Sequence, residues 1–136
     1  MIRPIMKDVL FLGQKSEKAT KQDRQAIADL HDTLGAHRGH CVGMAANMIG
    51  VRKRIIIVSL GFADMVMVNP EIVQRSQPYE TEEGCLSLQG VRKTTRYRKI
   101  KVRYQDEALT EHTQEFEGHT AQIIQHECDH LEGIII

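Results

Sequence analysis

The sequence predicts an α+β fold, with antiparallel or mixed β-sheets packed around a C-terminal helix and a second helix near the N-terminus. Helical patterns occur towards both ends of the chain, and the residues between them carry short β-branched or alternating runs. Strands grouped between helices, without a regular βαβ alternation, are typical of this class. The chain has 136 residues, a length that suits one hydrophobic core, so we expect a single domain over 1–136.

The first helix is predicted over 21–34, after an extended arm or loop at 1–13. Thr20 and Asp23 have the spacing of a capping box, with Asp in place of the usual Glu or Gln. Apolar side chains then recur at i, i+3 and i+7, as on the buried face of a helix. Gly35 is the candidate for the C-cap.

The strands are predicted from β-branched runs and from alternation of apolar with charged residues. A turn at Asn69-Pro70 separates the second strand from the third, and a turn near Asp106-Glu107 joins the last two. The predicted strands cover residues 55–58, 65–68, 72–75, 100–104 and 112–116.

The last predicted helix runs from 118 to 131, with Gly133 as its C-cap candidate, and carries the pattern H-E-x-x-H. Residues four apart share one face of a helix, so the imidazoles of His126 and His130 can bind one metal ion. Glu127 lies about 100° round the helix and can take a proton from water at the metal. The pattern predicts a hydrolytic metal site. The alternative is a pair of hydrogen-bonded core histidines that share this spacing by chance.

A catalytic metal usually has three protein ligands, so a third must come from elsewhere in the chain. The three cysteines are the candidates. Cys128 points to the apolar side of the last helix, where a small buried side chain is expected. Cys85 follows a glycine that lets the backbone approach closely, which makes it the best candidate, while Cys41 stays open. A thiolate with two imidazoles suits iron(II), zinc or a neighbouring transition ion.

The charge balance argues against DNA or a membrane surface as a partner. Lys plus Arg and Asp plus Glu each number 18, so the net charge is near zero. No window has the roughly 18 apolar residues of a membrane span, and residues 1–12 lack a signal-peptide cleavage site. Three cysteines are an odd number at low density, which favours a reducing compartment, and we expect a cytoplasmic protein.

Three segments, taken in order, resemble motifs of the peptide deformylases. Residues 83–87 reproduce the family motif E-G-C-L-S, and residues 125–130 reproduce Q-H-E-x-D-H. Residues 41–48 resemble its G-φ-G-φ-A-A-x-Q motif with two departures. The resemblance covers nearly the whole chain from the first helix onward.

The resemblance implies one divalent metal ion held by Cys85, His126 and His130, with Glu127 as general acid and base. Iron(II) is the ion expected in the cell, with zinc, nickel or cobalt as the alternatives in purified protein. The implied reaction is hydrolysis of the N-formyl group from the N-formylmethionine of nascent polypeptides, which releases formate.

The resemblance also implies contacts with the substrate. A backbone N–H at the Leu86 position stabilises the oxyanion, and extended substrate backbone pairs with an exposed strand edge near Gly43 and around Leu86. The methionine side chain is expected in an apolar pocket. Arg92, seven residues after the cysteine of the second motif, matches a family arginine near the substrate.

The first motif departs from the family pattern at two positions. Cys41 replaces its first glycine, and Met48 replaces its glutamine, whose side-chain amide is an oxyanion donor in the family. A thioether cannot donate a hydrogen bond. Either this is a working deformylase in which water, Asn47 or a rearranged loop replaces the donor, or it is a slower or differently specific amide hydrolase, or a metal-binding paralogue without catalysis. The presence of Glu127 favours catalysis, because a structural metal needs no base.

Two other classes of protein share a helix of this kind. A zinc endopeptidase takes its third ligand from a His or Glu after the motif, but only six residues follow, and Glu132 is too close to His130 to reach the same ion. A structural zinc site closes with four ligands, and Cys41 is then the fourth.

The chain ends at Ile136, soon after the metal-binding helix. Bacterial members of the family commonly carry a further C-terminal helix, with which some contact the ribosome, so this ending puts ribosome contact in doubt. It resembles the Gram-positive branch of the family, in which the chain ends as a short strand, expected here over 134–136.

Overall fold

The computed structural model describes residues 1–85 and 87–135. Helices and strands follow the order expected for an α+β fold, and the predicted fold class is confirmed. The elements of the described chain are α1 (Val9–Leu12), η1 (Lys21–Asp23, a 3₁₀ helix), α2 (Arg24–Ala36), β1 (Gly43–Ala45), η2 (Ala46–Ile49, a 3₁₀ helix), β2 (Ile55–Ser59), β3 (Asp64–Cys85), β4 (Leu88–Gln105), β5 (Glu111–Glu117) and α3 (Gly118–Leu131).

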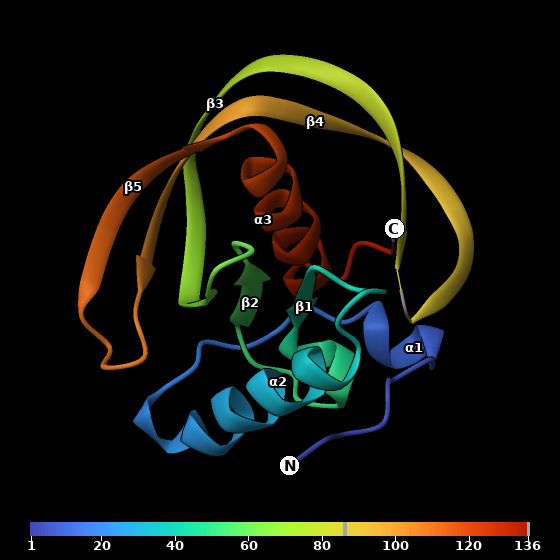
Figure 1. Ribbon diagram of the computed structural model, residues 1–136, viewed down its shortest axis with the longest axis vertical. Helices are drawn as coiled ribbons and strands as arrows, with labels where there is room; N and C mark the ends of the chain where they lie inside the picture. Colours follow the sequence, from blue (N-terminus) through green and yellow to red (C-terminus); the bar gives the residue numbers. More distant parts are fainter. Residues whose placement is uncertain (86, 136) are drawn as a thin grey trace.

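The strands of the described chain form one sheet in the order β1-β2-β3-β4-β5, and every neighbouring pair is antiparallel. The long strands β3 and β4 form a hairpin that arches over α3 (Figure 1). Helix α3 packs against β1, β2 and β4, while α2 packs against β1 and β2. The sheet therefore wraps around the C-terminal helix, as predicted. None of the described helices is both long and apolar enough to span a membrane.

Helix α2 begins where the capping box predicted it. The backbone N–H of Thr20 donates to Asp23 at 2.8 Å, and the first turn is the 3₁₀ helix η1. The C-cap prediction for Gly35 is wrong, since α2 continues to Ala36. The residue with the left-handed backbone that a C-terminal glycine usually provides is Gly39, at φ 98°.

The N-terminal arm is not extended throughout, so that prediction is wrong in part. Residues Val9–Leu12 form the short helix α1, whose first turn is capped by Asp8. The Asp8 carboxylate accepts a hydrogen bond from the backbone N–H of Leu10 at 2.9 Å. Leu12 is buried and anchors the turn to the core.

The turn predicted at Asn69-Pro70 is wrong, because β3 runs straight through these residues. Asn69 has φ 51°, and the pairing with β4 shifts register here, so the site is a β-bulge. The Asn69 side chain accepts the N–H of Ala19 at 2.8 Å and donates to the Ala19 carbonyl and to Gln105 Oε1, both at 2.9 Å. Bulges and turns favour the same residue types, which explains the error.

Replacing Asn69 by alanine is expected to lower the free energy of unfolding by about 2–3 kcal/mol, because three hydrogen bonds are lost and a positive φ is left to a residue with a Cβ. Urea denaturation measures the change. Asn69→Gly is the control, since it loses the same hydrogen bonds without the backbone strain. Its urea midpoint should lie between those of the parent and Asn69→Ala. An unchanged urea midpoint for Asn69→Ala would show that the bulge holds without these bonds.

Helix α3 ends at the predicted glycine. Gly133 has φ 76°, its N–H donates to the His130 carbonyl at 3.1 Å, and the N–H of Ile134 donates to the Asp129 carbonyl at 2.9 Å. The short strand expected over 134–136 is wrong for Ile134 and Ile135, which lie outside the strands. Ile136 falls outside the described residues.

Candidate active site

Helix α3 turns one face towards a cavity of about 430 Å³. His126 and Glu127 line this cavity, and His130 follows them one turn along the same face. All three side chains are buried. The opposite face, which includes Cys128, belongs to the hydrophobic core, so the role predicted for Cys128 is confirmed.

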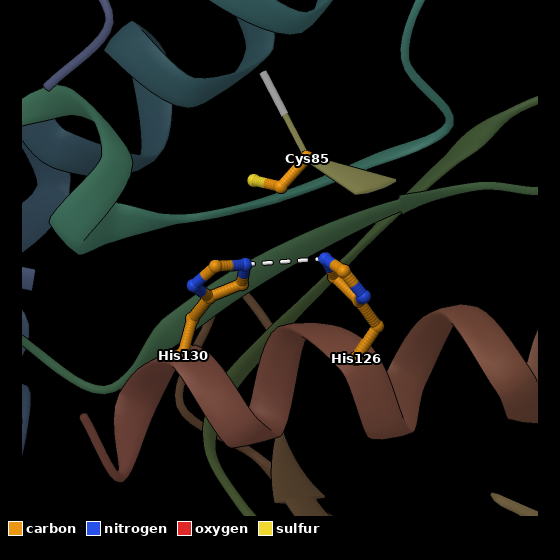
Figure 2. A group of neighbouring side chains, drawn as sticks. All are labelled: Cys85, His126 and His130. Atoms are coloured by element: carbon orange, nitrogen blue, oxygen red, sulfur yellow. Dashed lines mark hydrogen bonds between the residues drawn. The ribbon is translucent and has the colours of Figure 1, made fainter. Parts of the chain in front are cut away.

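Cys85 approaches these histidines from the end of β3 (Figure 2). The ligand atoms of Cys85, His126 and His130 all lie within 4.8 Å of one another, and the Nε2 atoms of the two histidines are 3.1 Å apart. Figure 2 shows both imidazole rings rising from α3 towards the cysteine. The structure thus brings together the three residues that the sequence predicted as metal ligands.

The donor set and its surroundings fit a divalent cation. The Nδ1 atom of His126 lies 2.8 Å from a Glu83 carboxylate oxygen, so the ring is held with Nε2 facing Cys85 and His130. Burial and the neighbouring His126 lower the pKa of His130 to about 3, so its imidazole is neutral and able to bind a metal. Burial lowers the pKa of His126, but its contacts with Cys85, Glu127 and Glu83 outweigh burial and raise that pKa to about 10, so a metal ion would displace a proton from this ring. A thiol and two imidazole nitrogens within a few ångströms are the soft donors that iron(II) and zinc accept.

Glu83 collects hydrogen bonds from three other side chains. Its carboxylate faces His126, accepts three bonds from the Arg96 guanidinium with a shortest distance of 2.7 Å, and accepts one from Gln122 at 2.8 Å. Burial raises the pKa of Glu83, but these partners outweigh it and lower the pKa to about 2. Glu83 is therefore a fixed anion behind His126, a predicted metal ligand.

Sequence reasoning missed most of this network. Glu83 was predicted only as part of a motif, and no role was assigned to it. Arg96, Gln122 and Asp129 were not predicted to belong to the site. Arg96 joins the network to the end of α3, because its Nη1 donates to Asp129 at 2.6 Å. These contacts join residues on β3, β4 and α3, so no residue spacing within a single element could have predicted them.

Glu127 is buried, and its Oε1 has no hydrogen-bond partner among the residues that the structure describes. Burial raises the pKa of Glu127 to about 7. A carboxyl group with this pKa exchanges a proton near neutral pH, which is what a general acid and base requires.

Gly43 borders the same carboxylate from β1. A Cβ at this position would lie 2.6 Å from Ile123 Cγ2 and 3.0 Å from Glu127 Oε2. Any larger residue at position 43 would push the Glu127 side chain out of its place. Gly43 therefore contributes to the site because it has no side chain.

The Gly43→Ala variant is expected to lower kcat for the hydrolysis that the resemblance implies roughly 10- to 100-fold, because the added methyl group displaces the Glu127 carboxylate. Metal content should stay that of the parent, since no metal ligand is touched. Gly35→Ala is the matched control, because an added Cβ there meets nothing within 4 Å. Full kcat in Gly43→Ala would mean that the Glu127 position tolerates the displacement.

Met48 lines the cavity and is 1% exposed. Its sulfur accepts a hydrogen bond from the Ala45 N–H at 3.4 Å, and it offers no donor to a substrate. Asn47 does not replace the donor, because it is fully buried outside the described lining of the cavity, and its Nδ2 donates to the His130 carbonyl at 2.9 Å.

Cys41 also lines the cavity, yet its thiol donates to the Gly43 carbonyl at 2.8 Å. Burial raises the pKa of Cys41 to about 11, so the thiol stays protonated. Among the described residues, Cys41 is not part of the group whose ligand atoms converge. The geometry therefore does not favour a closed four-ligand zinc site.

Two predicted substrate contacts remain predictions. Leu86 lies outside the described residues, so nothing is added about its N–H. Arg92 lies opposite Glu83 on β4 and is half-buried, but it does not belong to the described lining of the cavity.

Comparison with known proteins agrees with this site. The chain matches the family model described as polypeptide deformylase over residues 2–136. The chain belongs to the polypeptide deformylase family. A peptide deformylase from Clostridium beijerinckii is 60% identical over 136 residues, which are 100% of both chains.

Two solved structures are similar over almost their whole length. A Met-Ala-Ser-bound class I type b peptide deformylase from Acinetobacter baumannii has a TM-score of 0.89 and 30% identity, and the match covers 99% of this chain and 97% of that one. The Thermotoga maritima peptide deformylase has a TM-score of 0.90 and 28% identity, with 99% and 95% covered. Peptide deformylases are metal-dependent hydrolases. Membership of this family, and not of a peptidase family, decides against the zinc endopeptidase alternative.

Proposed function

We propose that this chain hydrolyses the N-formyl group of N-formylmethionyl polypeptides, releasing formate and a free α-amino group. The observation that carries the proposal is the convergence, at one cavity, of Cys85, His126 and His130 beside the buried carboxyl group of Glu127. We also infer that it acts in the cytoplasm, where its nascent substrates are made.

Cys85, His126 and His130 would hold the metal ion, and we propose iron(II) as the ion used in the cell. When bound, a divalent cation supplies Lewis acidity, which polarises a carbonyl group and lowers the pKa of water. Glu83 keeps the His126 ring turned towards this point, and Arg96 in turn keeps Glu83 ionised.

Glu127 moves the proton in this mechanism. Its carboxylate takes a proton from the attacking water as the new C–O bond forms at the formyl carbon. It then gives that proton to the amine nitrogen as the C–N bond breaks, so formate and the free amine leave together. The proposed donors to the oxyanion include the N–H of Leu86, while the side chain of Met48 contributes none.

The edge of the sheet offers a place for the peptide. Strand β1 is the first strand of the sheet and pairs only with β2 in the observed order, and its first residue, Gly43, lines the cavity. We propose that an extended substrate lies along this edge, with backbone hydrogen bonds to β1 and its formyl group at the metal ligands.

Formate release from a formyl-Met-Ala-Ser peptide tests the function. Enzyme prepared without oxygen and loaded with iron(II) is expected to turn over, and metal analysis should find one ion per chain. Cys85→Ala should lose both the ion and the activity. A protein that binds the ion yet releases no formate, even at high enzyme concentration, would favour the non-catalytic paralogue.

A direct comparison of metals tests the choice of ion. The same chain loaded with zinc, nickel or cobalt should be assayed beside the iron(II) form, in one buffer and at equal occupancy. We expect the iron(II) form to be at least as active as the others. A chain purified with bound zinc, and active only in that form, would overturn the iron assignment without touching the proposed reaction.

A further inference from the structure

The cavity is lined by more apolar than polar surface, but the first half of α3 adds polar side chains to its wall. The first half of α3 contributes His119, Gln122 and Ile123 to the lining, of which only Ile123 is apolar. An apolar pocket was expected from the family resemblance. Gln122 therefore needs an explanation.

Gln122 is held in one orientation by Glu83. Its Nε2 donates to Glu83 Oε2 at 2.8 Å, and Glu83 is ion-paired with the guanidinium of Arg96 at 2.7 Å. The amide nitrogen of Gln122, and not its oxygen, therefore faces Glu83, and an amide nitrogen carries two N–H donors. Among the described residues, the second N–H of Gln122 has no partner, and it belongs to a side chain that lines the cavity.

The position of Gln122 matches the distance to the first side chain of the substrate. Gln122 precedes His126 by one helical turn, which separates their Cα atoms by about 6 Å along α3. A formyl group at the metal ligands is joined through one nitrogen to the α-carbon of the formylated residue. The side chain of that residue is thus the part of the substrate that comes within reach of Gln122.

We propose that Gln122 is a specificity-determining residue, whose free amide N–H donates a hydrogen bond to the thioether sulfur of the formylated methionine. This inference rests on the proposed function. Sulfur is a weak acceptor, and norleucine is the matched substrate, because a methylene group replaces the sulfur in a side chain of nearly the same shape. With norleucine the N–H is left without a partner in the cavity, which costs affinity.

The test is a competition between formyl-Met-Ala-Ser and formyl-Nle-Ala-Ser in one reaction, read by mass spectrometry of the two products. The ratio of the two rates gives the ratio of kcat/KM, whatever fraction of the enzyme holds metal. The parent chain is expected to prefer methionine by about 3- to 10-fold. Gln122→Leu should bring the ratio to within about twofold of one.

His119→Leu is the matched control, since it makes the same wall less polar and leaves the Gln122 amide in place. Its ratio should stay that of the parent. Product peptides Met-Ala-Ser and Nle-Ala-Ser, tested as inhibitors, should show the same preference in binding alone. An unchanged ratio in Gln122→Leu, or a loss of preference in His119→Leu only, would overturn the assignment. Absence of turnover with either substrate would instead count against the proposed function.

Discussion

Replacing Glu127 by glutamine is expected to lower kcat for formate release by about 100- to 10,000-fold. The glutamine has nearly the same shape, but it can neither take a proton from water nor give one to the leaving amine. Glu127 is buried at the cavity, and its raised pKa of about 7 lets the carboxyl group do both near neutral pH. The measurement is formate release under saturating substrate, with metal content determined on the same sample.

Glu132→Gln is the control for this substitution. Glu132 follows α3 directly, is exposed, and accepts a hydrogen bond from Arg54 at 2.9 Å, so its loss should leave kcat unchanged. Metal content should be the same in all three proteins, because Cys85, His126 and His130 are intact. If Glu127→Gln retained more than a tenth of the parent rate, the proton would have to travel through another group.

Replacing Met48 by glutamine is expected to raise the rate of formate release by 10-fold or more. Loss of one oxyanion donor costs on the order of 100- to 1000-fold elsewhere, so restoring one gives a gain in this direction. The side chains have similar length, and Met48 already lines the cavity. The glutamine oxygen can accept the Ala45 N–H in place of the sulfur, which leaves the amide nitrogen to face the substrate.

Met48→Leu separates this effect from repacking. Leucine fills the same buried space without a donor, so that variant should stay as slow as the parent. A Met48→Gln variant that is slower than the parent would show that Met48 has a positive role in the site. An equal rate in all three proteins would place the missing donor elsewhere, for example on an ordered water.

Several elements of the fold were predicted from the sequence, because each of them is marked by a local pattern of residues. The capping box at Thr20, the β-branched run at 55–58 and the helix ending before Gly133 depend on neighbours in the chain, and all were found. The long hairpin of β3 and β4 was not predicted. Residues 76–85 and 90–99 carry no clear alternation, since most of their side chains are exposed, and β3 and β4 hold together through their mutual pairing there.

The metal ligands were predicted for a similar reason. His126 and His130 share a helix, and Cys85 lies in a motif. Arg96, by contrast, meets Glu83 across two strands and Asp129 on a helix, so its role follows from tertiary packing alone. The Asn47 amide is the opposite case. From its chemistry it was a candidate to replace the oxyanion donor lost at position 48, yet in the structure it donates to the backbone of α3.

The two edges of the sheet differ in a way that bears on aggregation. At the far edge, β5 is mostly exposed and carries three glutamates: Glu111, Glu115 and Glu117. Glu117 lies 3.9 Å from Lys99, and Glu111 lies 3.8 Å from Arg103, so charged side chains of both signs line this edge. Charged side chains on an edge strand disfavour pairing with a second copy. Strand β1, at the other edge, has only three residues, and a very short edge strand offers little length for pairing with a second copy. The edge proposed to hold extended substrate is thus short, while the longer edge on the opposite side of the sheet carries charges that disfavour pairing between copies.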